Sequence, residues 1–139
     1  MLKYNNMIEF NKTKKENFYL VYKSMCESHG FPALHIDNIE EVFICKKDGL
    51  LVYSCFKWNT GSAMCMIGFP VSNLDLVVPK GFKDGLLQKF FGYISEVCKS
   101  EGYSIIWTTS ATKRVERALS KSDFQKGDQN VNTYIKVLS

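Results

Sequence analysis

The run from Lys80 to Gly85 (KGFKDG) has the residue types and spacing that best suit binding chemistry. It follows Val77-Val78-Pro79 and precedes an amphipathic helical pattern. A glycine turn at a helix start leaves several backbone N–H groups without a helical partner, and such groups bind anions. Glycine also lets the main chain approach a ligand closely. The sequence therefore predicts a turn that binds a phosphate or pyrophosphate, with Lys80 and Lys83 as further contacts.

The cysteines and histidines show no pattern typical of a metal site or a disulfide framework. The five cysteines are Cys26, Cys45, Cys55, Cys65 and Cys98. Their number is odd, and they form no CxxC motif and no pairing with histidine, so we expect reduced, buried thiols. His29 closes the first predicted helix and His35 lies in the following loop, where surface or capping roles are expected. A Cys–His nucleophile pair can meet in space without adjacent spacing, so the sequence leaves that alternative open.

The composition is that of an ordinary globular protein. The 139 residues are 45% hydrophobic and 23% charged, with a formal net charge of +4. This length suits a single domain, expected over residues 1–139. The longest apolar stretches have the length of strands, and residues 1–11 lack the apolar segment of a signal peptide. We therefore expect a cytoplasmic protein without membrane association.

Basic residues gather in two places, residues 12–15 and residues 113–121. A nucleic-acid-binding protein usually concentrates more charge on one face, with aromatic residues interleaved. We interpret the two patches as solvated helix faces first, as sites for a phosphate-bearing ligand second, and as a nucleic-acid surface third.

The first half of the chain predicts a strand, a helix and an antiparallel meander. Residues 7–10 form the strand candidate, and Thr13 with Glu16 fits a capping box at the start of the helix. That helix ends at Gly30-Phe31-Pro32. Asp48-Gly49 lies between two β-rich runs, residues 42–47 and 50–58, and predicts a hairpin. A third strand is expected over residues 62–69.

The second half predicts alternating strands and helices. Residues 74–78 either extend the third meander strand after a bulge or form a separate short piece. A helix is expected from about Lys83 to Gly102, then a buried central strand over residues 104–109, then a helix over residues 112–121. A last hairpin joins residues 124–126 to residues 131–137, and Trp58 and Trp107 are expected in the core. The predicted fold class is α+β, with a mixed sheet flanked by helices.

This order of elements, with a Val-x-Pro approach and a glycine turn before a helix, resembles the GCN5-related N-acetyltransferase (GNAT) superfamily. The resemblance covers essentially the whole chain and implies binding of acetyl-CoA, with no metal. Of three positions in the family's phosphate motif, Gly85 is kept, whereas Phe82 and Leu87 replace the usual residues; Leu87 puts a bulky side chain beside the expected phosphate. The resemblance implies the following acyl-CoA contacts: Val77, Val78, Lys80, Gly81, Phe82, Lys83, Asp84, Gly85, Leu86 and Thr112.

The second family motif is an asparagine after the next strand and a tyrosine on the next helix, which protonates the leaving thiolate. Thr112 and Leu119 stand at these positions. Because leucine has no proton to give, the sequence does not support tyrosine-dependent transfer. Arg117-Ala118-Leu119 resembles the corresponding helix of small GNAT-like bacteriophage proteins.

The resemblance implies a carboxylate base near the point where two central strands part. Asp75 is the first candidate and Glu41 the second, although both also fit ordinary carboxylates at strand ends. The predicted function is acyl-CoA-dependent N-acyl transfer to an amine. The alternative is a non-catalytic GNAT-like phage protein, either a virion component or an inhibitor that binds a host protein. A role in nucleic-acid binding rests only on a modest positive charge.

Overall fold

The computed structural model describes residues 7–33, 35–110 and 112–127, together with Tyr134, Lys136 and Leu138, and for Phe69 the main chain only. The helices and strands, in chain order, are β1 (Ile8–Lys14), α1 (Lys15–Ser28), the short 3-10 helix η1 (Ile36–Asn38), β2 (Glu41–Lys47), β3 (Leu50–Asn59), β4 (Met64–Ser72), α2 (Leu86–Ser100), β5 (Ile105–Trp107) and α3 (Lys113–Lys121).

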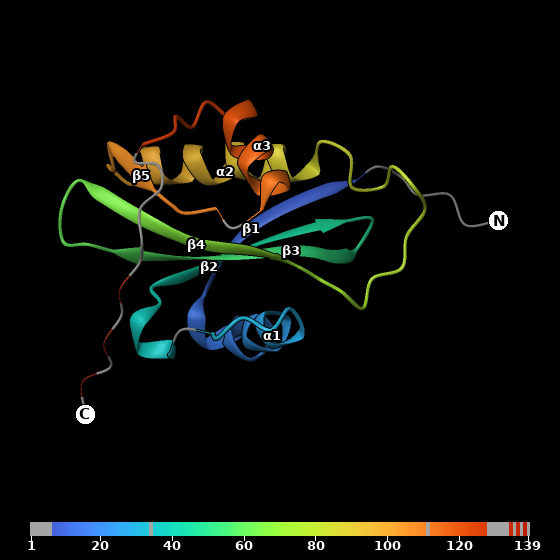
Figure 1. The fold of residues 1–139 in the computed structure, drawn as a ribbon, viewed down its shortest axis with the longest axis horizontal. Coiled ribbons are helices and arrows are strands. Elements are labelled where there is room, and N and C mark those ends of the chain that lie inside the picture. Colours follow the sequence, from blue (N-terminus) through green and yellow to red (C-terminus); the bar gives the residue numbers. More distant parts are fainter. Residues whose placement is uncertain are drawn as a thin grey trace.

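The five strands described form one sheet in the order β1-β2-β3-β4-β5. The first three neighbouring pairs are antiparallel, and β4 and β5 are parallel. Helices α2 and α3 cover one face of the sheet, and α1 with η1 covers the other (Figure 1). The structure therefore confirms the predicted α+β class, with a mixed and mostly antiparallel sheet between helices.

The hairpin between β2 and β3 forms where the sequence places it. Asp48 has φ 52° and Gly49 has φ 78°. Two central residues with positive φ are what a type I′ turn requires, and this turn matches the twist of the flanking strands. The Asp-Gly pair therefore sets the register between β2 and β3.

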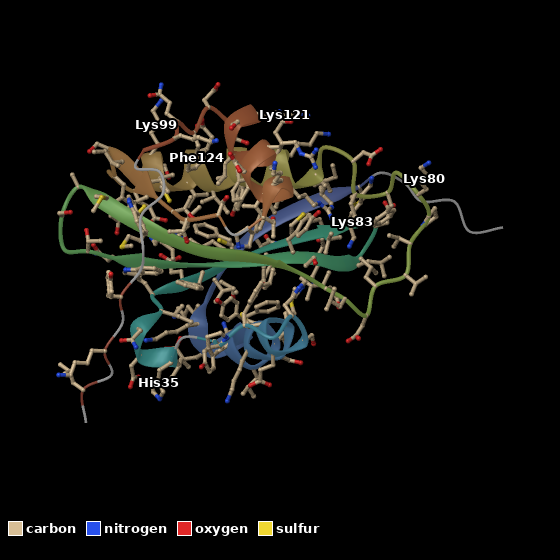
Figure 2. All side chains as sticks on the ribbon, viewed as in Figure 1. His35, Lys80, Lys83, Lys99, Lys121 and Phe124 are labelled. Atoms are coloured by element: carbon tan, nitrogen blue, oxygen red, sulfur yellow. The ribbon has the colours of Figure 1, made fainter. Side chains whose placement is uncertain are left out.

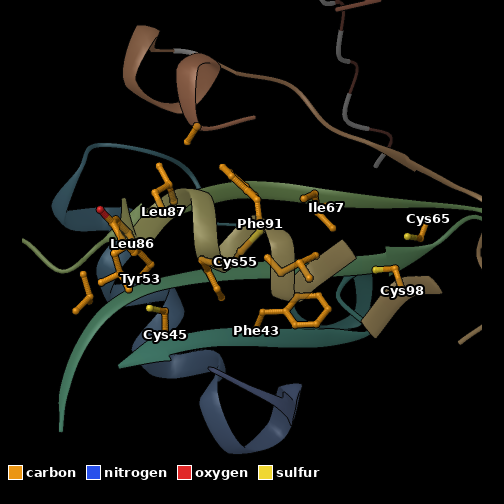
Figure 3. Packing of buried hydrophobic residues seen from close by; sticks show 14 of the residues in the cluster. Phe43, Cys45, Tyr53, Cys55, Cys65, Ile67, Leu86, Leu87, Phe91 and Cys98 are labelled. Carbon is orange, nitrogen blue, oxygen red and sulfur yellow. The ribbon is translucent and has the colours of Figure 1, made fainter. Parts of the chain in front are cut away.

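Each face of the sheet has its own hydrophobic core. Between the sheet and α2, Phe43, Tyr53 and Phe91 pack with several cysteines (Figure 3). Between the sheet and α1, Tyr22 meets Phe56 edge to face with ring centroids 5.4 Å apart. All five cysteines are free and buried, as expected. Burial raises the pKa of the Cys45 and Cys98 thiols to about 12, so both are poor nucleophiles at neutral pH.

The start of the first helix differs from the prediction. Thr13 lies in β1, opposite Val42 of β2, and α1 begins at Lys15. The N-cap residue, Lys14, makes no side-chain capping hydrogen bond. The capping-box prediction is wrong because pairing with β2 extends the strand through Lys14 and draws Thr13 into the sheet.

The segment between β4 and α2 contains no strand. Strand β4 runs to Ser72, and residues 74–78 form a loop in which the Val77 side chain is 93% exposed. Helix α2 begins three residues later than predicted, at Leu86, because residues 80–85 form consecutive turns that end with Gly85 at φ 68°. That left-handed conformation cannot be part of a right-handed helix.

The last strand described is shorter and more exposed than predicted. Strand β5 has three residues, and within the described chain it pairs with β4 alone. Side chains of a strand point alternately to opposite faces, and here Ile105 and Trp107 are exposed, Trp107 by 46%. The core assignment of Trp107 is therefore wrong. Residues 124–127 are not in a strand, and residues 131–137 lie, apart from isolated positions, outside the described residues.

None of the helices in the described chain is long and apolar enough to cross a membrane.

Candidate functional site

Strands β4 and β5 are paired over only three residues. The last pair is Met66 with Trp107, and beyond it Thr108 donates a side-chain hydrogen bond of 2.9 Å to the carbonyl of Ile67. From Gly68 to Ser72, the β4 edge on that side has no strand partner among the described residues. The two parallel strands thus part beside a stretch of main chain that can still form hydrogen bonds.

A bulge lies in the same part of β4. The register changes from Phe56 opposite Gly68 to Ser54 opposite Val71, so two residues of β4, at positions 69 and 70, lie opposite one residue of β3, Cys55. A Cβ atom on Gly68 would lie 1.7 Å from the Phe56 ring. Only glycine fits there, because the ring packs directly against the main chain of β4.

The turn before α2 is tightly folded. The Phe82 N–H donates to the Pro79 carbonyl and the Asp84 N–H donates to the Gly81 carbonyl, both at 3.1 Å. Gly81 has φ 84°, and Gly85 is the N-cap of α2 without a side chain to cap it. The Leu86 N–H donates to the Lys83 carbonyl at 3.1 Å, whereas the N–H groups of Leu87 and Gln88 have no acceptor in the described chain and remain available to an anion from outside the helix.

Two large apolar side chains of the turn region point into the protein. Phe82 and Leu87 are each 6% exposed and belong to the core between the sheet and α2. The Lys47 ammonium lies 4.7 Å from the centroid of the Phe82 ring and donates to the Phe82 carbonyl at 2.6 Å. Leu87 is thus a core residue and does not cover the turn, and Lys47 ties the turn to the end of β2.

Positive charges converge beside this turn. The Lys83 ammonium lies 6.0 Å from the centroid of the Tyr53 ring, and an Arg114 Nη donates to the Tyr53 hydroxyl at 2.8 Å. Figure 2 shows Lys83 turned toward the sheet and Lys80 on the outer side of the turn. Burial and then the nearby Arg114 charge hold the pKa of Lys83 below its ordinary value. Within the described chain, Lys47, Lys83 and Arg114 form no ion pair with a carboxylate.

We call Lys47, Lys83 and Arg114, with the Tyr53 hydroxyl, the turn cluster. Sequence reasoning named Lys83 but did not bring it together with residues from β2, β3 and α3. Thr112 accepts a hydrogen bond of 3.2 Å from the Val115 N–H and so caps α3 two residues before Arg114. The spacing of Tyr53 and Arg114, 61 positions apart, gives no signal of their contact.

The opposite end of α2 carries a different group of charges, which we call the C-terminal ion-pair cluster. Its residues are Lys12, Glu40, Glu41, Lys57 and Glu101. The Lys57 side chain is 0% exposed, and its ammonium lies 2.7 Å from a Glu101 oxygen and 3.2 Å from a Glu41 oxygen. Lys12 contacts the other oxygen of each carboxylate, at 2.9 Å and 3.1 Å. Burial opposes the charge on Lys57, but hydrogen bonds to the carboxylates outweigh it and raise the pKa.

The two predicted catalytic carboxylates lie apart. Asp75 is exposed in the loop after β4, and its main-chain N–H donates to the Asn73 side chain at 3.1 Å. Glu41 begins β2, and both of its carboxylate oxygens contact lysines of the C-terminal ion-pair cluster. Only Asp75 lies in the chain segment that joins β4 to the turn.

His29 joins the end of α1 to the end of β4. Its Nε2 atom lies 2.8 Å from the Ser72 carbonyl oxygen and 3.2 Å from the Ser72 hydroxyl. A carbonyl only accepts hydrogen bonds, so the short contact requires a proton on Nε2. That nitrogen cannot then accept a proton from Ser72, and the pair does not form a serine nucleophile with its base.

Two hollows in the described part of the protein lie away from the turn before α2. One, of about 650 Å³, is lined by Lys15, η1 and the end of β3 near Trp58, and the other, of about 360 Å³, lies between α2 and β5. Leu119, at the position of the family tyrosine, packs against the core between the sheet and α2.

Comparisons with known proteins bear on the fold. No protein-family model and no curated protein sequence matches this chain. An aminoglycoside acetyltransferase from an uncultured soil metagenomic sample, solved with sisomicin, is similar in structure with a TM-score of 0.64 and 12% identity, over 96% of this chain and 99% of that one. A ribosomal-protein-alanine N-acetyltransferase from Brucella melitensis biovar Abortus 2308 gives 0.64 and 12%, over 94% and 99%.

A third solved structure contains a ligand of direct interest. An aminoglycoside N-acetyltransferase in complex with CoA gives a TM-score of 0.58 and 10% identity, over 98% of this chain and 99% of that one. At such low identities the similarity concerns the fold alone, but it extends over nearly all of each chain. This chain therefore has the fold of the GCN5-related N-acetyltransferases.

Proposed function

We propose that this protein is an acyl-CoA-dependent N-acyltransferase that acts on an amine. The observation that carries the proposal is the uncompensated positive charge of the turn cluster, placed beside a glycine turn where β4 loses its β5 partner. Solved proteins of similar fold include a ribosomal-protein-alanine N-acetyltransferase, and an aminoglycoside N-acetyltransferase was solved with CoA. A phosphate-bearing ligand would supply the missing negative charge at this turn.

Different parts of the site bind different groups of the ligand. The turn from Lys80 to Gly85, with the N–H groups of Leu87 and Gln88 in the first turn of α2, binds the pyrophosphate. The β4 edge from Gly68 to Val71, which has no strand partner in the described chain, binds the amide groups of the pantetheine through main-chain hydrogen bonds. Val77, which is exposed, and Val78 offer apolar contacts beside the turn. Acyl-CoA supplies an activated thioester, and the protein contributes chiefly by holding it next to the amine.

The protein's own groups limit the proton chemistry. Glu41 is engaged by two lysines, whereas Asp75 is exposed and forms no ion pair within the described chain. We therefore assign the base to Asp75. Leu119 provides no proton, so the departing thiolate takes its proton from solvent in this proposal.

An assay of free-thiol release tests the proposal. Acetyl-CoA is incubated with the protein and a panel of amines that includes an aminoglycoside and a peptide with N-terminal alanine. We expect thiol release above the rate without protein for at least one amine. No release with any amine, together with no CoA binding at millimolar concentration, would contradict the proposal.

A pair of variants at Gly85 places the activity at the turn. Gly85→Glu adds a negative side chain at the helix start, so CoA binding and thiol release should both be lost. Gly85→Asn serves as the matched control, because asparagine tolerates the positive φ of 68° without adding charge. Equal affinity for CoA in the two variants would move the ligand away from this turn.

A further inference from the structure

The Tyr53 hydroxyl has a hydrogen atom without an acceptor in the described chain. The residue is 3% exposed, and its oxygen accepts a hydrogen bond from Arg114. A tyrosine hydroxyl both accepts and donates, and a buried donor is normally paired. In the described part of the protein the hydroxyl has Arg114 as its single partner, so its O–H is free to donate to a group that is not part of the protein.

Lys83 and Arg114, the two cations next to Tyr53, also have N–H groups without an acceptor among the described residues. A guanidinium has five N–H groups, and the described contacts of Arg114 use one, on Tyr53. Lys83 has three N–H groups and faces the Tyr53 ring, without a hydrogen-bond acceptor among the residues described. Three side chains, from β3, the turn and α3, thus bring spare hydrogen-bond donors to one place.

The positions of these donors are fixed by other contacts. Lys47 holds the carbonyl of Phe82, the residue before Lys83, at 2.6 Å. Thr112 caps α3 two residues before Arg114, and the Tyr53 ring stacks on Phe90 with centroids 6.3 Å apart. Donors held in place before a ligand arrives lose less entropy when it binds.

We propose that Tyr53, Lys83 and Arg114 form a side-chain clamp for one phosphate group of the ligand. The hydroxyl donates to one phosphate oxygen, the guanidinium donates to others, and the ammonium adds a point charge. The assignment of that phosphate to CoA rests on the proposed function, whereas the clamp itself requires only a phosphate group. A phosphate held in this way would join β3, the turn and α3.

Titration calorimetry with three ligands tests the clamp. CoA, inorganic pyrophosphate and pantetheine, which has no phosphate, are titrated into the wild type, Arg114→Gln, Tyr53→Phe and Arg117→Gln. The last variant is the matched control, because Arg117 is an exposed arginine on the same helix, one turn away. We expect Kd for CoA and pyrophosphate to rise at least about tenfold in Arg114→Gln and about threefold to tenfold in Tyr53→Phe. Arg117→Gln should match the wild type, and pantetheine should respond to none of the changes.

The outcomes separate the clamp from the proposed function. CoA binding that is equal in all four proteins would overturn the clamp while leaving the acyltransferase proposal in place. Pyrophosphate binding that weakens as expected, in a protein that transfers no acetyl group, would support the clamp and contradict the acyltransferase. An equal loss of affinity in Arg117→Gln would also overturn the clamp, because it would show a general effect of charge. Circular dichroism and thermal melts confirm that each variant is folded, and Lys83→Gln provides a second test at the same place.

Discussion

The two ends of α2 treat their positive charges in opposite ways. At the C-terminal end, Lys12 and Lys57 share the carboxylates of Glu41 and Glu101, with ammonium–oxygen distances between 2.7 and 3.2 Å. At the N-terminal end, the cations of the turn cluster contact a carbonyl, a ring and a hydroxyl. At the C-terminal end of α2 the ammonium groups pair with carboxylates. At the N-terminal end the cations have no carboxylate partner in the described chain.

The contrast separates a structural role from a binding role. A buried cation such as Lys57 requires carboxylate partners, because desolvation of an unpaired charge is very unfavourable. Burial and, after it, the nearby Arg114 charge lower the pKa of Lys83, so the charged form of Lys83 is disfavoured in the free protein. An arrangement that is unfavourable in the free protein and favourable with an anion is what a binding site requires.

The largest expected effect on stability is at the C-terminal end of α2, where the ammonium groups pair with carboxylates. Glu101→Gln removes the closest partner of the fully buried Lys57, and we expect a loss of about 2–3 kcal/mol in the free energy of unfolding. CoA affinity should not change, because the turn cluster is untouched. Urea denaturation measures the first quantity and calorimetry the second. Glu96→Gln, a change at an exposed position of α2, should leave both unchanged.

Acid should weaken the same end. Burial opposes ionisation of Glu101, but hydrogen bonds from Lys12 and Lys57 outweigh it and hold its pKa below the ordinary 4.5. A depressed folded pKa gives a contribution to stability that is complete above pH 4.5 and is lost as the pH falls through the folded value. Urea midpoints between pH 7 and pH 3 should therefore fall less steeply in Glu101→Gln than in the wild type. Parallel curves would show that the carboxylate adds nothing through its charge.

Alkali tests the lysines of that cluster in the other direction. The pKa values of Lys12 and Lys57 are raised above 10.5. The contribution of these lysines to the free energy of unfolding is therefore fully present below pH 10.5 and is lost as the pH rises through the folded pKa values.

The smallest effect on stability is expected at the N-terminal end of α2, in the turn cluster. Because the pKa of Lys83 is lower in the folded than in the unfolded protein, its positive charge reduces the free energy of unfolding, and this reduction is fully present at any pH below the folded pKa. Lys83→Gln should therefore raise the free energy of unfolding, by less than about 1 kcal/mol because solvent screens a partly exposed charge. The same change should weaken CoA binding. Lys80→Gln, on the exposed side of the turn, is the control for stability, and a loss of stability in Lys83→Gln would contradict the contrast between the two ends.

Local patterns in the sequence predict most of the fold. The Asp48-Gly49 pair, the apolar stripe of α2 and the glycine turn all depend on neighbouring residues, and all were found in the expected places. The errors arise where tertiary contacts decide. Thr13 joins a strand because β2 pairs with it, and Trp107 is exposed because it lies on the face of β5 opposite to Ile106, which packs against the core.

The candidate site could be predicted only in part. The turn from Lys80 to Gly85 is visible as a pattern, because its glycines and lysines are adjacent in the chain. Tyr53 and Arg114 are not, because their contact depends on how β3 and α3 pack about α2. The pairing of Lys57 with Glu101, 44 positions away, likewise depends on the three-dimensional fold.

Amide NMR shifts during a titration with CoA test the central claim most directly. The largest shifts should fall on residues 83–88 and on Arg114, at the N-terminal end of α2. Residues of the C-terminal ion-pair cluster, such as Lys57 and Glu101, should not move. Shifts centred on Lys57 and Glu101, or no shift at millimolar CoA, would contradict the claim that the N-terminal end of α2 is the binding site.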